Sequence, residues 1–163
     1  MKYTLATIIF LSGSAVFAQS FSADLSPPWD GIKVPEGQQC TLFGGNGATP
    51  EINVHAVPAG TALIRVEFND KSYEPLSENG GHGVIGFTVN GEEAKLPSVP
   101  GLSADLPAGA EVLAAARSSG NYASPGYLPP CSGGRGNRYM ADVIALDAQG
   151  NELGRTAVEL GLY

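Results

Sequence analysis

The chain has 163 residues, of which 43% are hydrophobic and 15% charged, and it contains 22 glycines and 12 prolines. This length suits one domain with a hydrophobic core, and so many turn-forming residues argue against a coiled coil or a helical bundle. Sixteen acidic residues against nine basic ones give a net charge of −7. That balance disfavours nucleic acid as a partner, because binding to phosphates requires a basic surface.

The first eighteen residues have the pattern of a secretory signal peptide. A lysine follows the initial methionine, residues 3–11 are apolar, and small residues occupy the −3 and −1 positions before Gln19. The apolar run is about half of the roughly 20 residues that a transmembrane helix needs. We therefore predict a signal peptide over residues 1–18, a single domain over residues 19–163, no transmembrane segment after cleavage, and a periplasmic or secreted protein.

The chain contains two cysteines, Cys40 and Cys131, and both lie in the predicted mature part. An exported chain meets an oxidising compartment, where an even number of cysteines usually indicates a disulfide bond. Two separate buried thiols are the alternative. The export signal favours the bridge between Cys40 and Cys131.

Short apolar and β-branched segments recur along the mature chain and predict strands. The predicted strands are residues 51–57, 61–68, 82–89, 138–146 and 152–160. Residues 110–117 have helical propensity but are short and lie between glycines, so both helix and strand stay open there. Residues 19–39 should be irregular or form an edge, and residues 92–109 show no strong periodicity. The pattern therefore indicates a mainly β protein.

Two of the predicted strands have an apolar face that can be read directly. Ile52, Val54 and Ala56 alternate in the first of them, and Tyr139, Ala141, Val143 and Ala145 alternate in the strand over residues 138–146. Long loops over residues 69–81 and 118–137 separate the strands, and loops of this length are often functional. We expect the two loops to meet over one end of a sheet.

No catalytic or metal-binding motif is present. The sequence lacks G-x-S-x-G, H-E-x-x-H, C-x-x-C and the phosphate-binding P-loop. We therefore expect a protein that is not an enzyme and that uses no cofactor and no metal.

The two histidines differ in their surroundings. His55 occupies a position that strand alternation assigns to solvent, whereas His82 follows two glycines that allow a ligand to approach the backbone. A structural role for His82 is the alternative. The glycine-rich stretches 44–47 and 133–136 are candidates for anion-binding loops, and Arg135 lies in the second.

Residues 126–147 read GYLPPCSGGRGNRYMADVIALD. This stretch resembles G-Y-x-x-P-C-P-P-x-x-x-H-R-Y-x-x-x-V-x-A-L-D of the bacterial, Raf-kinase-inhibitor-like branch of the phosphatidylethanolamine-binding protein (PEBP) family. Further similar segments occur in the expected order. They are residues 45–50 (GNGATP), 57–61 (VPAGT), 81–85 (GHGVI) and 106–109 (LPAG). The resemblance covers nearly all of the predicted mature chain.

The resemblance implies a PEBP-like antiparallel β-sheet sandwich with a few short peripheral helices. It also implies a small surface pocket for phosphate-type anions or phospholipid head groups. His82 and Tyr139 match two pocket residues of the family, and Asn137 stands where the family has a second histidine.

The family's D-P-D-x-P motif is altered in this chain, and so is the tryptophan that follows the first histidine. Phe68 aligns with the first aspartate and Asp70 with the second, and Gly83 takes the place of the tryptophan. Arg135 or Arg138 would neutralise a bound anion, and a Cys40–Cys131 bridge would anchor the pocket loop.

The sequence therefore predicts an exported protein that binds a small anionic ligand, such as phosphate or a phospholipid head group. The predicted ligand-binding residues are His82, Asn137, Tyr139, Asp70 and Arg138. The alternative is an extracytoplasmic inhibitor or interaction module that contacts a protein partner through residues 69–81 and 118–136.

Overall fold

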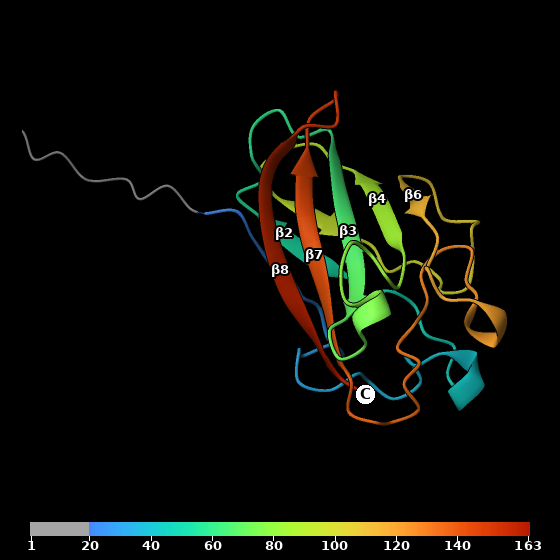
Figure 1. Cartoon of the computed structure of the whole chain (residues 1–163). Coiled ribbons are helices and arrows are strands. Elements are labelled where there is room, and N and C mark those ends of the chain that lie inside the picture. The colour runs from blue at the N-terminus through green and yellow to red at the C-terminus, as the bar shows by residue number, and fades with distance from the viewer. Residues whose placement is uncertain (1–19) are drawn as a thin grey trace, which may run out of the picture.

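A computed structural model describes residues 20–163 as two antiparallel β-sheets with three short 3-10 helices (Figure 1). The signal peptide predicted for residues 1–18 lies outside the described residues. The smaller sheet has the order β1-β2-β5, with β1 at Ser22–Leu25, β2 at Ile52–His55 and β5 at Ala94–Leu96. The larger sheet has the order β6-β4-β3-β7-β8, with β6 at Ala110–Ala114, β4 at Val84–Thr88, β3 at Leu63–Asp70, β7 at Arg138–Leu146 and β8 at Glu152–Leu162.

The core lies between the two sheets. The alternation predicted for β7 is confirmed, because Tyr139, Ala141, Val143 and Ala145 are all buried in one hydrophobic cluster. Ile52 and Val54 of β2 join the same cluster from the smaller sheet, which lies behind the larger one in Figure 1. Burying a Val or Ile side chain contributes roughly 1.5–3 kcal/mol. Packing between the sheets therefore provides the main stabilisation of this mainly β fold.

The inner face of β3 leads from this core to one end of the sheet. Its residues Ile64, Val66 and Phe68 are buried in the core, and the next residue on the same face is Asp70. β3 pairs with β7 so that Asp70 lies opposite Tyr139. The strand therefore carries an apolar face for most of its length and ends on a carboxylate.

Several boundaries differ from the prediction. Residues 110–117 contain the strand β6 rather than a helix, because the segment pairs with β4. β5 was missed in the region without periodicity, since three residues are too few to show an alternation. Ala56 does not extend the face of β2, because it has a φ of 49° and the strand ends at His55. The loop predicted to begin at position 69 begins after Asp70.

The predicted short peripheral helices are 3-10 turns. They are η1 at Thr41–Phe43, η2 at Glu74–Leu76 and η3 at Gly120–Tyr122. η2 and η3 lie within the two long loops that were predicted from the sequence. No helix among residues 20–163 is long and apolar enough to cross a membrane.

The predicted disulfide bond between Cys40 and Cys131 is present, and its Cα atoms are 5.2 Å apart. Both cysteines are buried and pack against Ala116 and Leu128 in a second, smaller cluster. The Cys40 N–H also donates a hydrogen bond to the carbonyl of Pro130. The bridge therefore joins the loop before β7 to the segment that leads into η1.

Candidate functional site

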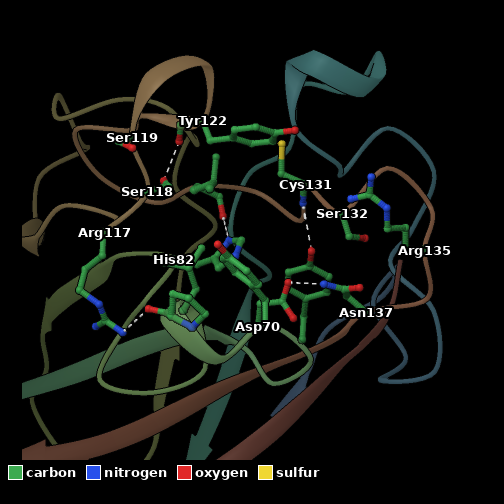
Figure 2. Close-up of a pocket in the computed structure, with 15 residues that line it drawn as sticks. Asp70, His82, Arg117, Ser118, Ser119, Tyr122, Cys131, Ser132, Arg135 and Asn137 are labelled. Atoms are coloured by element: carbon green, nitrogen blue, oxygen red, sulfur yellow. Dashed lines mark hydrogen bonds between the residues drawn. The ribbon is translucent and has the colours of Figure 1, made fainter.

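A pocket of about 440 Å³ opens where the two long loops meet at one end of the larger sheet (Figure 2). Four of the five predicted ligand-binding residues line it: Asp70, His82, Asn137 and Tyr139. They come from the end of β3, the turn before β4, the residue before β7 and the second residue of β7. The expected meeting of the two loops over one end of the sheet is confirmed.

His82 is held rigidly at the base of this pocket. Its backbone N–H donates to the Phe68 carbonyl at 2.8 Å, and its backbone carbonyl accepts from the Leu128 N–H at 2.8 Å. The ring Nδ1 lies 2.8 Å from the Leu128 carbonyl oxygen. Because a carbonyl oxygen only accepts, Nδ1 carries a hydrogen and donates it. Backbone and ring are therefore both fixed by the neighbouring loop.

The environment of His82 disfavours a charged ring. Only 3% of the residue is exposed, and this burial lowers the pKa of the imidazole below its usual value. The hydrogen bond to Leu128 and the charge of Asp70 act in the opposite direction but have smaller effects. At neutral pH the ring is therefore neutral. With Nδ1 protonated, its Nε2 carries a lone pair and can accept a hydrogen bond.

Asp70 provides a buried carboxylate beside this ring. Its Oδ1 accepts from the backbone N–H of Ser72 at 2.9 Å, and its Oδ2 accepts from Asn137 Nδ2 at 2.6 Å. None of the ion pairs among residues 20–163 includes Asp70. Asn137 therefore satisfies one lone pair of the carboxylate without cancelling its charge.

Tyr139 completes the floor of the pocket. Its ring meets that of His82 edge to face, with 5.3 Å between centroids, and its hydroxyl accepts from the Cys131 N–H at 3.2 Å. Burial raises the pKa of this phenol to about 12, so the hydroxyl keeps its proton at neutral pH. The Tyr139 O–H is therefore a hydrogen-bond donor on the pocket floor.

Two sequence departures from the family motif have a structural explanation. Phe68 lies in the core and packs against Tyr127 with ring centroids 4.6 Å apart, so the pocket carboxylate is Asp70 and not the residue at position 68. Gly83 has a φ of 108°, and a Cβ there would lie 2.6 Å from the Gly126 carbonyl oxygen. A side chain as large as tryptophan does not fit at position 83.

Arg138, the fifth predicted residue, does not line the pocket. Its Nε and Nη2 donate to the two carboxylate oxygens of Glu159 at 2.9 and 2.7 Å. Successive side chains of a strand point to opposite faces, so Arg138 and Tyr139 cannot both face the pocket. Arg135, which the sequence singled out as the other cation, does line it.

Arg117 also lines the pocket and was not predicted. Its guanidinium donates to the carbonyls of Pro75, Glu78 and Asn79 at 2.7–3.1 Å, and its backbone N–H donates to the Gly81 carbonyl. These bonds join the loop that contains η2 to the end of β6. The sequence does not predict that Arg117 holds this loop, because every partner of its guanidinium is a backbone carbonyl.

The rim of the pocket is formed by both loops. Tyr73 and Tyr122 are about half exposed and line the opening, and Arg135 stands in a run of glycines in which Gly133, Gly134 and Gly136 have positive φ. Arg135 forms no hydrogen bond or ion pair with residues 20–163. Its guanidinium is therefore available to a ligand.

The second histidine lies on the smaller sheet and does not line this pocket. His55 contacts Asp24 through Nε2 and Glu93 through Nδ1, both at 2.6 Å, and about a third of its side chain is exposed. The two carboxylates raise the pKa of His55. Residues 20–163 contain no cluster of three or more His, Cys, Asp or Glu side chains arranged to hold a metal ion.

Comparison with solved structures supports the fold class. The chain is similar to CT736 of Chlamydia trachomatis, described as a phosphatidylethanolamine-binding protein homologue, and to YbcL of Escherichia coli, described as a new member of the mammalian PEBP family. For each, the TM-score is 0.55 and the identity 19%, over 88% of this chain and 97% of the other. No protein-family model and no curated protein matches the sequence. The chain therefore has the PEBP fold.

Proposed function

We propose that this protein is an exported binding protein whose pocket holds a small anionic group, such as phosphate or a phospholipid head group. The observation that carries the proposal is the convergence of His82, Asp70, Asn137 and Tyr139 beneath the unpaired Arg135. A buried donor such as the Tyr139 hydroxyl and a free guanidinium are the groups that proteins use to bind anions.

Export is supported by the signal-peptide pattern of residues 1–18 and by the disulfide between Cys40 and Cys131. Disulfides persist in oxidising compartments such as the periplasm or the extracellular space. We therefore propose that the ligand is met outside the cytoplasm.

A binding role suits the pocket better than catalysis. Cys131 is in the disulfide, and the hydroxyls of Ser132 and Ser118 donate to the backbone oxygens of Tyr163 and Tyr122 at 2.7 and 2.6 Å. A nucleophilic hydroxyl requires an adjacent base that accepts its proton. These hydroxyls donate to carbonyls instead.

Binding of inorganic phosphate by the oxidised protein, measured by titration calorimetry at pH 6, tests the proposal. Arg135→Gln should weaken binding by about three- to tenfold, because one exposed charge-assisted hydrogen bond is lost. Arg138→Gln removes the same charge from a side chain outside the pocket and should leave the affinity unchanged. Equal losses in the two variants would indicate a general effect of charge and no ligand in the pocket.

A second candidate function is recognition of a protein partner by residues 69–81 and 118–136. It is favoured by the exposed rings of Tyr73 and Tyr122, which stand on these two loops at the rim of the pocket. Tyrosine is enriched at protein interfaces. A variant with Tyr73→Ser and Tyr122→Ser should then lose capture of an extracytoplasmic partner and keep phosphate binding.

A further inference from the structure

We propose that the pocket selects a phosphoryl group that still carries at least one O–H, as inorganic phosphate does near neutral pH and as a phosphomonoester does in its monoanionic form. Anions that have no such proton, namely sulfate and phosphodiesters, are excluded. This inference rests on the proposed function that the pocket binds an anion. It narrows the ligand class and makes Asp70 the specificity-determining residue.

The argument begins with the hydrogen-bond acceptors on the pocket floor. The carboxylate of Asp70 has no cationic partner. The Ser72 N–H donates to one of its oxygens and Asn137 to the other, so each oxygen keeps a further lone pair that can accept. His82 donates through Nδ1 to Leu128, so the Nε2 of the neutral ring is also an acceptor. Nε2 has no hydrogen-bond partner among the described residues. The Asp70 carboxylate and the His82 Nε2 are therefore the two hydrogen-bond acceptors that a ligand would meet on the pocket floor.

A fully ionised anion is itself only an acceptor. Beside Asp70 it would meet a negative charge in a partly buried site, where like charges repel strongly. A ligand O–H changes this contact from a repulsion to a charge-assisted hydrogen bond, because the hydroxyl donates to the carboxylate. The remaining phosphoryl oxygens accept from the Tyr139 O–H and from Arg135.

The arginines that line the pocket do not remove the need for an O–H on the ligand. Arg117 is occupied by three backbone carbonyls, so Arg135 is the cation left for the ligand among the residues described. The Tyr139 phenol keeps its proton at neutral pH, because burial raises its pKa to about 12. The titratable and charged groups that line the pocket are Asp70, Tyr73, His82, Arg117, Tyr122, Arg135 and Tyr139.

Selection of the monoanion gives a defined dependence on pH. A phosphomonoester loses its second proton near pH 6, and the pocket binds the form that retains it. By linkage, the affinity for total phosphomonoester falls about tenfold per pH unit above that value. A pocket that instead protonated His82 on binding would show a similar slope for sulfate as well.

Calorimetric titrations of the oxidised protein separate these cases. At pH 6 the probes are inorganic phosphate and methyl phosphate, which carry the O–H, and sulfate and dimethyl phosphate, which do not. We expect the first pair to bind at least tenfold more tightly than the second at pH 6. The affinity for methyl phosphate should decline from pH 6 to pH 8, whereas inorganic phosphate, which still carries one O–H as its dianion, should keep more of its affinity. Equal affinity for sulfate and phosphate would overturn this inference and leave the proposed function standing. Absence of any phosphate binding would overturn both.

Free phosphate and a lipid head group share this chemistry, and two lipids distinguish them. Short-chain phosphatidic acid ends in a phosphomonoester, whereas short-chain phosphatidylethanolamine contains a phosphodiester. Tighter binding of phosphatidic acid than of methyl phosphate would identify a lipid ligand, and equal binding a free phosphoryl compound. Equal affinity for the two lipids contradicts the requirement for an O–H.

Substitution of Asp70 sharpens the test. Asp70→Asn replaces the carboxylate by a neutral amide and should raise the affinity for sulfate at least tenfold, so that the preference for phosphate disappears. Asp105→Asn makes the same change at an exposed carboxylate whose side chain forms no hydrogen bond within residues 20–163, and it should leave the preference intact. An unchanged preference in folded Asp70→Asn protein would contradict the role of Asp70. The comparison of phosphate with sulfate on the unsubstituted protein decides the question if that variant fails to fold.

Discussion

His82 and His55 show how two regions of one fold shift the pKa of the same side chain in opposite directions. His82 is buried at the pocket floor, and burial lowers its pKa. His55 lies on the smaller sheet between Asp24 and Glu93, and the hydrogen bonds that its ring donates to these carboxylates raise its pKa. Position in the fold thus favours the neutral ring at His82 and the protonated ring, held between two carboxylates, at His55.

Removing the disulfide bond beside the pocket should give the largest change in stability. Replacement of both Cys40 and Cys131 by serine removes the bridge between the loop before β7 and the segment that leads into η1. Loss of a native disulfide costs about 2–5 kcal/mol of unfolding free energy. Urea denaturation measures the change. NMR signals from residues around His82 should shift, while those around His55 should stay in place. A variant as stable as the parent would show that the bridge does not constrain the pocket.

Truncating each histidine compares the two regions directly. His82→Ala leaves the Leu128 carbonyl without its donor and opens space in a buried site, so we expect a loss of about 1–3 kcal/mol in unfolding free energy. His55→Ala is the matched control and should cost less, because exposed ion pairs contribute little. The comparison fails if His55→Ala proves the more destabilising change.

Stability should respond to pH through His55 in a direction fixed by its raised pKa. The folded protein binds the His55 proton more tightly than the unfolded chain, so the stabilisation is full below the unfolded value of about 6.5. It is lost as the pH rises through the folded pKa. The difference in unfolding free energy between the parent and His55→Gln should therefore shrink from pH 6 to pH 9. For His82 the sign is opposite: its contribution is present above about pH 6.5 and is lost as the pH falls.

The titration midpoints of the two histidine rings test the smallest of the expected effects, which is the opposite shift of their pKa values. In NMR spectra recorded against pH, the His55 ring should titrate above the usual value of about 6.5 and the His82 ring below it. His55→Gln identifies the signals by removing one set. Two midpoints near the usual value would show that neither environment acts as described.

Much of the fold could be predicted from the sequence, because strand alternation and paired cysteines leave direct traces. The buried face of β7 follows from its period of two, and the Cys40–Cys131 bridge from an even number of cysteines after a predicted signal peptide. The same period explains the error at Arg138: a residue next to Tyr139 in a strand faces the other side. That signal was available in the sequence.

Other features of the site depend on tertiary pairing and leave no local trace. The register of β3 against β7 places Asp70 opposite Tyr139 and sends Phe68 into the core. Arg117 acts through three backbone carbonyls of a loop some 40 positions earlier. Neither arrangement can be derived from spacing, because both depend on how distant segments meet.

The most direct test of a ligand pocket is one NMR titration of the oxidised protein with inorganic phosphate at pH 6, in which both histidines are observed. Signals from the His82 ring and from the amides of Asn137 and Tyr139 should shift together and saturate. The His55 ring should not move, which makes it an internal control for ionic strength. Flat signals at His82 up to tens of millimolar phosphate, or equal shifts at both rings, would contradict a specific anion pocket.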